Sequence, residues 1–240
     1  MESRLPPSSL IICSRNRPRL LFETVESVLR GSQLPAEMVI VDQSAEPNPD
    51  LPEMKTERPC EVRYLHSKTV GVSAGRNLGI TSSRYDVLIF IDDDMFVASD
   101  WYDNLMRAVV HAGRSSVVTG RVLPGESEMP DQKTSPSTKA DQEPAVYQGR
   151  IGRDVLYSGN MGAYRSVLKR WAFSTNGLGR GRRFPPLRIT TSAFACSSGD
   201  TASATRRKRS CSTAPGVPKA RSFRSNGDMA WGRGLFMQST

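Results

Sequence analysis

The sequence lacks any long hydrophobic run, and no apolar stretch approaches the roughly 18–20 residues that cross a membrane. Residues 1–7 contain no apolar segment of the kind that a secretory signal requires. Cysteine is scarce: Cys13, Cys60, Cys196 and Cys211 form no CxxC pair and no metal-binding pattern. These absences predict a cytoplasmic protein with free thiols and argue against a membrane-spanning or secreted one.

Positive charge is concentrated at the C-terminal end. The formal net charge is +9, but residues 187–240 hold nine Lys and Arg against two Asp and Glu, a net of +7, which leaves +2 for residues 1–186. The few aromatic residues of the basic segment are not interleaved with its basic ones, so no specific nucleic-acid partner is expected. We interpret 187–240 as a basic, disordered tail. The alternatives are a tether to acidic lipid at the inner face of the membrane and, more distantly, a nucleic-acid-binding protein.

The composition, 38% hydrophobic and 24% charged, excludes a wholly disordered or fibrous protein. Continuous apolar runs alternate with segments of helical spacing. Such runs, apolar on both faces, are typical of parallel strands covered by helices on both sides, so the predicted fold class is α/β. A polar, proline-rich stretch at 126–144 is predicted to be a long surface loop. Strands are predicted at 9–13, 38–41, 62–65, 87–91 and from Val117, and helices from Pro18, over 71–83 and after Ser99 or Asp100.

Aspartates follow two of the predicted strands. Asp42 ends the second strand, and the fourth runs into Asp92, Asp93 and Asp94. Ligands of open α/β sheets bind beyond the carboxyl ends of the strands. On an extended segment Asp92 and Asp94 face the same side, and three adjacent carboxylates repel one another unless a positive charge lies beside them. The pattern favours a site for Mg²⁺ or Mn²⁺ together with substrate phosphates, and the alternative is a solvated acidic turn.

Five segments carry a resemblance to a known family. They are LIICSRNRP at 10–18, VIVDQS at 39–44, GVSAGRNLG at 71–79, FIDDD at 90–94 and SGNMGAYR at 158–165. In this order and at these gaps, the chain resembles glycosyltransferase family 2 over roughly residues 9–170. The resemblance implies the GT-A fold, a Rossmann-like and mostly parallel sheet with helices on both faces. In a domain of residues 1–186, residues 9–119 would form the nucleotide-sugar-binding half and residues 120–186 part of the acceptor half.

The resemblance also implies roles for individual residues. Asp42 would accept a hydrogen bond from the nucleotide base, and Arg76 would offset phosphate charge, although taken alone Arg76 is equally well explained as a surface arginine on a helix. In the DXD motif, Asp92 would contact the ribose or the cation, and Asp94 would bind the cation that bridges the diphosphate. The implied nucleotide-sugar-binding residues are Arg15, Asp42, Arg76, Asp92, Asp93 and Asn160, and the implied metal ligands are Asp94 and Asp92.

Several of these residues have a plain structural interpretation beside the functional one. Arg15, placed near the nucleotide by the resemblance, is equally explained as a solvated loop arginine. Asn160, placed at the donor-sugar end, is also a residue that forms turns. The glycines Gly71, Gly75 and Gly79 do not match a dinucleotide-binding fingerprint and are expected to allow a turn or close helix packing.

The activity that the resemblance implies is an inverting transfer. A sugar would pass from a nucleotide-diphospho-sugar donor to a hydroxyl of a saccharide or lipid-linked acceptor, with a divalent cation on the diphosphate. The family takes its general base from a downstream Glu-Asp motif, which is absent after residue 186, so no catalytic base is identified. The alternative is a defective relative that only binds nucleotide. A sugar nucleotidyltransferase is disfavoured because residues 13–18 contain no glycine.

The reading frame offers one explanation for the missing motif. Codons exist for residues 187–194 that, read from the third base, encode Glu-Asp-Asn-Asp-Phe-Gly-Phe. At the same offset, residues 171–176, 199–204 and 210–216 also yield family-like strings. Because these codons were chosen, the frameshift is a hypothesis: small insertions or deletions around the codons of Arg170 and Pro186 would have removed the base.

Overall fold

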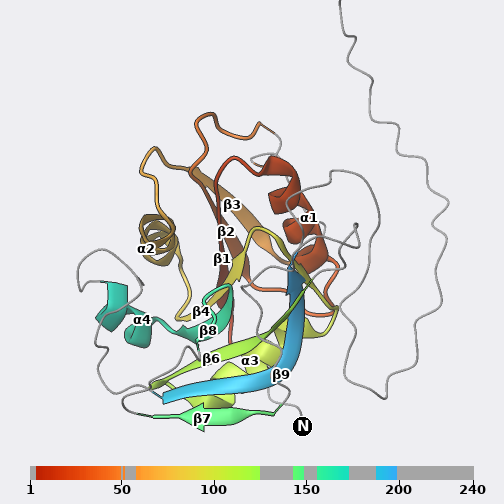
Figure 1. Cartoon of the computed structure of the whole chain (residues 1–240), viewed down its shortest axis with the longest axis vertical. Coiled ribbons are helices and arrows are strands. Elements are labelled where there is room, and N and C mark those ends of the chain that lie inside the picture. The colour runs from red at the N-terminus through yellow and green to blue at the C-terminus, as the bar shows by residue number, and fades with distance from the viewer. Residues whose placement is uncertain are drawn as a thin grey trace, which may run out of the picture.

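A computed structural model describes residues 4–49, 51, 58–124, 143–148, 156–172 and 188–198. These residues form one mixed sheet flanked by helices (Figure 1), with strand order β3-β2-β1-β4-β8-β6-β9-β5 and β7 paired to β9. The strands are β1 (Ser8–Ser14), β2 (Glu37–Asp42), β3 (Glu61–His66), β4 (Val87–Asp92), β5 (Met95–Val97), β6 (Ser116–Leu123), β7 (Ala145–Tyr147), β8 (Asn160–Tyr164) and β9 (Arg188–Ser198). The helices are α1 (Pro18–Leu29), α2 (Val72–Ser82), α3 (Trp101–Ala112) and α4 (Arg165–Ala172).

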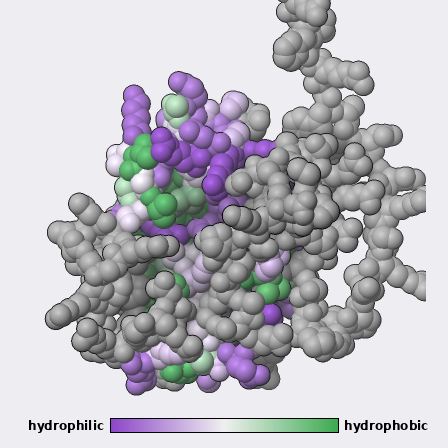
Figure 2. Space-filling view, viewed as in Figure 1, coloured by the Kyte–Doolittle hydropathy of each residue, from purple (hydrophilic) through white to green (hydrophobic). Residues whose placement is uncertain are grey.

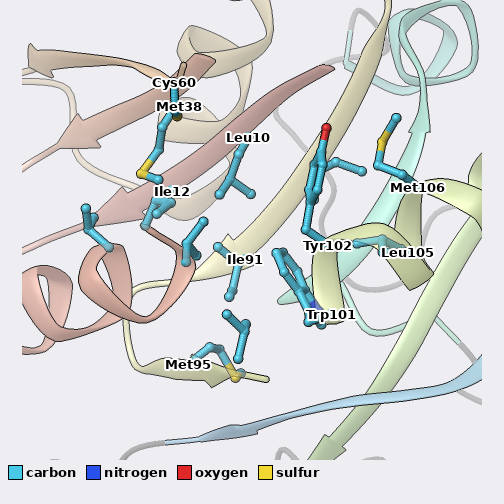
Figure 3. Packing of buried hydrophobic residues seen from close by; sticks show 14 of the residues in the cluster. Leu10, Ile12, Met38, Cys60, Ile91, Met95, Trp101, Tyr102, Leu105 and Met106 are labelled. Atoms are coloured by element: carbon cyan, nitrogen blue, oxygen red, sulfur yellow. The ribbon is translucent and has the colours of Figure 1, made fainter. Parts of the chain in front are cut away.

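The strands β3, β2, β1 and β4 are mutually parallel; β1, β2 and β4 are buried on both faces, whereas the edge strand β3 is only partly buried. Alternate side chains of each strand enter different clusters: Leu10 and Ile12 pack with α1 and α3, whereas Ile11 packs on the opposite face with residues of α2 and α4. Figure 3 shows the first cluster, in which Trp101 and Tyr102 of α3 lie beside the strands. Burial of both faces explains the continuous apolar runs, and the α/β prediction is confirmed.

Helix α2 lies close to β1 because glycines take the place of larger side chains. A Cβ atom on Gly79 would come within 2.4 Å of Ile11 Cγ2, and one on Gly75 would lie 3.3 Å from Cys13 Sγ. Gly71, which precedes the helix, has φ +129°, a backbone conformation that other residues rarely adopt. The prediction that these glycines allow close packing and a turn is confirmed.

The second half of the sheet departs from the purely parallel layer that the alternation of strands and helices predicts. Strand β8 runs antiparallel between β4 and β6, with Asn160 opposite Ile91 and Ala163 opposite Val117. Strand β6 runs in the same direction as β4, because both are antiparallel to β8, so the mostly parallel GT-A arrangement holds with β8 inserted between them. The sequence of β8, NMGAY, is too short and too rich in small residues to stand out as a strand.

Strand β9 corrects the prediction of a disordered tail from residue 187. It lies parallel to β6 and antiparallel to β5 and β7. The run Ile189-Thr190-Thr191 is β-branched and suits a strand, and Ile189 and Thr191 are buried. Three residues are too few to establish a periodicity, which is why the sequence pattern missed them. Residues 199–240, and residues 125–142 of the predicted loop region, lie outside the described residues.

None of the described helices is long and apolar enough to cross a membrane. Cys13 and Cys60 carry free thiols, and burial raises the pKa of each to about 12. Both are therefore protonated and unreactive at neutral pH.

Candidate functional site

The carboxyl ends of β1, β2 and β4 meet at one edge of the sheet. Ser14 of β1 lies opposite Asp42 of β2, and Cys13 of β1 lies opposite Asp92 of β4. Asp42 and Asp92 therefore flank β1 at the same end, as the sequence predicts. The loops that follow β1, β2 and β3 lie above this edge in Figure 1, and Figure 2 shows that hydrophilic residues dominate the coloured surface there.

Asp42 is a buried, rigid and ionised carboxylate, only 2% exposed. Its Oδ1 accepts hydrogen bonds from the backbone N–H (2.9 Å) and the Oγ (2.5 Å) of Ser44, and its Oδ2 accepts one from the hydroxyl of Tyr64 at 2.6 Å. Burial acts to raise the pKa of Asp42, but these hydrogen bonds outweigh it and the pKa is lowered. Burial and the contact with Asp42 raise the pKa of Tyr64 to about 12. Tyr64 and Ser44 therefore fix the direction in which the carboxylate points.

The chain turns directly after β4. Asp92 ends the strand, Asp93 and Asp94 form a turn, and β5 begins at Met95. The prediction that Asp92 and Asp94 face the same side assumed extended backbone, but the strand ends at Asp92 and a turn follows. Instead, Asp93 and Asp94 share one arginine, and Asp92 pairs with another.

Arg76 of α2 is the partner of Asp92. Its Nη2 donates to Asp92 Oδ1 at 2.9 Å and its Nη1 donates to Ser158 Oγ at 2.9 Å. Since its side chain is only 8% exposed, the interpretation as a surface arginine is wrong. Gly159 packs against the other carboxylate oxygen, because a Cβ atom there would come within 2.2 Å of Asp92 Oδ2. The side chain of Asp92 remains 38% exposed and so can contact a ligand.

Arg17 holds the other two aspartates, and the sequence analysis missed it. Its Nη1 lies 3.3 Å from Asp93 Oδ1 and 3.2 Å from Asp94 Oδ2. Its position depends on Asn16, whose φ of +56° turns the chain after β1 and whose backbone N–H donates to Ser44 Oγ at 2.7 Å. A signal was present: three adjacent carboxylates require positive charge, and this arginine follows the strand next to theirs.

Burial and mutual repulsion govern the ionisation of the turn. Burial raises the pKa of Asp94 to about 6, with further increases from Asp93 and Asp92, while Arg17 opposes the rise. Burial also raises the pKa of Asp93, against the lowering effect of the hydrogen bond that Ser14 Oγ donates to it at 2.6 Å. The negative charge of the turn is therefore incompletely compensated, an environment that attracts a cation.

Two further predicted site residues have different surroundings. Asn160 is completely buried: its Oδ1 accepts from Trp101 Nε1 at 3.0 Å and its Nδ2 donates to the carbonyl of Arg121 at 2.9 Å. It joins α3, β8 and β6 and so lies in a strand rather than in a turn, while its place at the donor sugar stays a prediction. Arg15 is exposed, and within the described residues it forms no ion pair with the aspartates.

The residues present suit a cation that shares its coordination with phosphates. Among the described residues, no three His, Cys, Asp or Glu side chains are arranged to enclose a metal ion. Mg²⁺ typically uses one or two carboxylates and completes its shell with substrate phosphates and water. Asp92 and Asp94, with side chains 38% and 22% exposed, supply oxygen ligands of this kind.

The ionisation of Asp94 predicts a pH dependence. A cation must displace the proton from this carboxyl once the pH falls below its pKa of about 6 in the metal-free protein. We expect the dissociation constant of Mn²⁺ alone to rise roughly tenfold per pH unit below pH 6 and to be nearly constant above pH 7. Electron paramagnetic resonance of free Mn²⁺ measures this directly. A dissociation constant that does not change between pH 5 and pH 7 would contradict the assignment of Asp94.

The fold and the site together define a class of protein. A sheet that gathers carboxylates and buried arginine at the carboxyl ends of its parallel strands is typical of nucleotide-binding α/β proteins. The family model described as glycosyl transferase family 2 matches residues 9–171, and the chain belongs to this family.

Relatives match a little less than half of the chain. The chain is 29% identical over 113 residues to the succinoglycan biosynthesis protein ExoM of Rhizobium meliloti, which covers 45% of this chain and 36% of that protein. It is 30% identical over 119 residues to a glucosyl-dolichyl phosphate glucuronosyltransferase of Haloferax volcanii. That match covers 48% of this chain and 38% of the relative. The matches therefore span little more than a third of the length of these relatives.

Solved structures share the fold. The S. aureus protein TarS (residues 1–349) has a TM-score of 0.56 at 15% identity, covering 81% of this chain and 60% of that chain. GalNAc-T7, solved with UDP, GalNAc and Mn²⁺, has a TM-score of 0.60 at 17% identity. The likeness covers 83% of this chain and 45% of GalNAc-T7. These likenesses confirm the GT-A fold that the sequence motifs imply.

Proposed function

We propose that this chain binds a nucleotide-diphospho-sugar together with Mg²⁺ or Mn²⁺ and transfers the sugar, with inversion, to a hydroxyl of a saccharide or lipid-linked acceptor. The observation that carries the proposal is the convergence of Asp42, Arg76 and the Asp92–Asp94 turn at one edge of the sheet. TarS has been solved with UDP-GlcNAc and GalNAc-T7 with UDP and Mn²⁺, which supports a donor of this class.

The donor side of the reaction follows from the contacts of these residues. Asp42 is an oriented acceptor, because Tyr64 and Ser44 fix its carboxylate, and it would receive a hydrogen bond from the nucleobase. Asp92, fixed on one side by Arg76, would receive hydrogen bonds from the ribose on its exposed side. Arg76 adds a buried positive charge near the diphosphate. These residues bind and orient the nucleotide rather than move protons.

A cation held by Asp94 and Asp92 would, when bound, neutralise the charge that develops on the departing nucleoside diphosphate. The arginines act in the same direction, because Arg76 and Arg17 lie against the turn and carry positive charge. Stabilising a leaving diphosphate needs this preorganised charge more than any covalent participation by the protein.

The acceptor side favours a second candidate, a relative that binds the donor but transfers sugar poorly. The observation behind it is the absence of a Glu-Asp pair in residues 187–240, where the family's base is expected. Without a base to take the proton of the acceptor hydroxyl, transfer loses roughly 10²–10⁴-fold while donor binding is unaffected.

The proposal is tested by thermal unfolding with a panel of nucleotides in Mn²⁺. A ligand at 100 times its dissociation constant stabilises the folded state by about 2.7 kcal/mol, which raises Tm by several degrees. We expect such a shift with at least one of UDP, GDP or dTDP, or their sugar conjugates, and a much smaller shift in EDTA or with the matching monophosphate. If none of these compounds changes Tm in Mn²⁺, the proposed donor class is wrong.

A further inference from the structure

Arg17 occupies the position in the aspartate turn where a cation would bind. A single atom, Nη1, contacts both Asp93 Oδ1 and Asp94 Oδ2 at 3.3 and 3.2 Å. Within the described residues, Arg17 is the only side chain that forms an ion pair or hydrogen bond with Asp94. Its backbone is fixed at the start of α1, where its carbonyl accepts from the N–H of Leu21 at 3.0 Å, but its side chain is 43% exposed and can move.

The turn does not depend on Arg17 for its shape. Ser14 Oγ donates to Asp93 Oδ2 at 2.6 Å, and Thr24 Oγ1 donates to the carbonyl of Asp93 at 2.9 Å. Both of these donors are buried and come from elements on either side of the loop that carries Arg17. The guanidinium can therefore leave while the backbone of the turn and the Asp93 carboxylate stay in place.

Arg76 cannot take the same part. Its side chain is buried and is held at both nitrogens, by Asp92 and by Ser158. The two arginines therefore differ: one is a fixed charge of the site, and the other is a mobile charge that neutralises the turn in the metal-free protein.

We propose that Arg17 is a positioning residue that stands in for the divalent cation and makes cation binding depend on a bound nucleoside diphosphate. This inference rests on the proposed function. A cation bonded to the Asp94 carboxylate would lie beside the guanidinium of Arg17, whose Nη1 is 3.2 Å from Asp94 Oδ2, and the two positive charges would repel each other. A diphosphate removes the conflict, because its oxygens offer the displaced guanidinium a strong bidentate partner.

The consequence is a coupling between the two ligands. In the wild type, Mn²⁺ that binds alone must displace Arg17 from Asp94, and the guanidinium then gains no new partner. When UDP is also bound, the displaced guanidinium pairs with the diphosphate. Reciprocity requires that each ligand strengthens the binding of the other by the same factor. Removal of the guanidinium should strengthen the binding of Mn²⁺ alone and reduce this factor.

The test is a titration of Mn²⁺, with and without UDP, at pH 8, where the carboxylates are ionised. For the wild type we expect UDP to tighten Mn²⁺ binding at least about tenfold. For Arg17→Gln we expect Mn²⁺ alone to bind roughly three- to tenfold more tightly than to the wild type, with a smaller effect of UDP. Arg17→Lys retains the charge and should remain close to the wild type. Arg19→Gln, which removes an exposed arginine paired with Glu23 on the same helix, is the matched control and should behave as the wild type.

The outcomes separate this inference from the proposed function. If Arg17→Gln binds Mn²⁺ alone no more tightly than the wild type, or if Arg19→Gln gives the same increase, the role of Arg17 is wrong although UDP still binds. If none of UDP, GDP and dTDP binds to these proteins in Mn²⁺, the proposed function itself fails, and with it the basis of the inference.

Discussion

Replacement of Asp94 by alanine is expected to weaken UDP binding in Mn²⁺ by about 100-fold or more, to the level seen in EDTA, without loss of stability. The carboxylate is the proposed metal ligand, and removal even of groups that support a ligand typically costs 10–100-fold. Its pKa is raised to about 6, mainly by burial and then by Asp93 and Asp92, so its ionised form is disfavoured in the metal-free fold. Isothermal titration with UDP, and thermal unfolding in EDTA, measure the two effects.

Asp92→Asn is expected to differ from Asp94→Ala in stability. It should also abolish the Mn²⁺-dependent affinity, but it removes the ion-pair partner of a buried arginine, Arg76. Leaving such a group incompletely paired costs about 1–3 kcal/mol, so this variant should unfold at a lower temperature. Asp103→Ala, which breaks an exposed pair with Arg107 on α3, is the control and should not affect UDP binding. Unchanged affinity in both site variants would mean that the turn is only an acidic loop.

Restoration of the hypothetical reading frame is expected to raise sugar transfer by roughly 10²–10⁴-fold, the usual contribution of a general base. The comparison uses the chain as given and a chain in which the shifted frame is read over residues 171–176 and again from residue 187, with the same donor and acceptor. Donor binding should be similar in the two proteins, because Asp42, Arg76 and Asp92–Asp94 are identical in both.

The control for this comparison is the restored chain with its Glu-Asp pair changed to Gln-Asn. This variant should return to the slow rate of the chain as given while it still binds the donor. If the chain as given transfers sugar as fast as the restored one, the frameshift hypothesis is wrong, and residues 187–240 are a functional part of the enzyme.

The parallel half of the fold could be predicted because its strands are continuous apolar runs. Both faces of β1, β2 and β4 are buried, so their sequences need no alternation and stand out from their surroundings. The strands β8 and β9 gave no such signal. Asn160–Tyr164 becomes a strand by pairing with β4, some seventy positions earlier, and Arg188–Ser198 by pairing with β6, β5 and β7. Pairing between distant segments leaves little trace in the local sequence.

The same distinction applies to the site. Asp42 and Asp92 could be placed because a strand end fixes the position of its last residue. The adjacent carboxylates signal a positive charge nearby, but the contacts that identify Arg17 depend on the left-handed conformation of Asn16 and on the turn at Asp93. The hydroxyl of Tyr64 likewise donates to Asp42 from the neighbouring strand β3. Such partners become visible only when the segments are brought together.

A crystal structure of the protein with UDP and Mn²⁺ tests the central claim most directly. We expect the nucleotide at the carboxyl ends of β1, β2 and β4, with the base at Asp42 and an anomalous peak for Mn²⁺ within coordination distance of Asp94. We also expect the guanidinium of Arg17 to have left Asp94 for the diphosphate. A nucleotide bound at another part of the surface, or Mn²⁺ bound away from the aspartate turn, would contradict the assignment of this edge as the donor site.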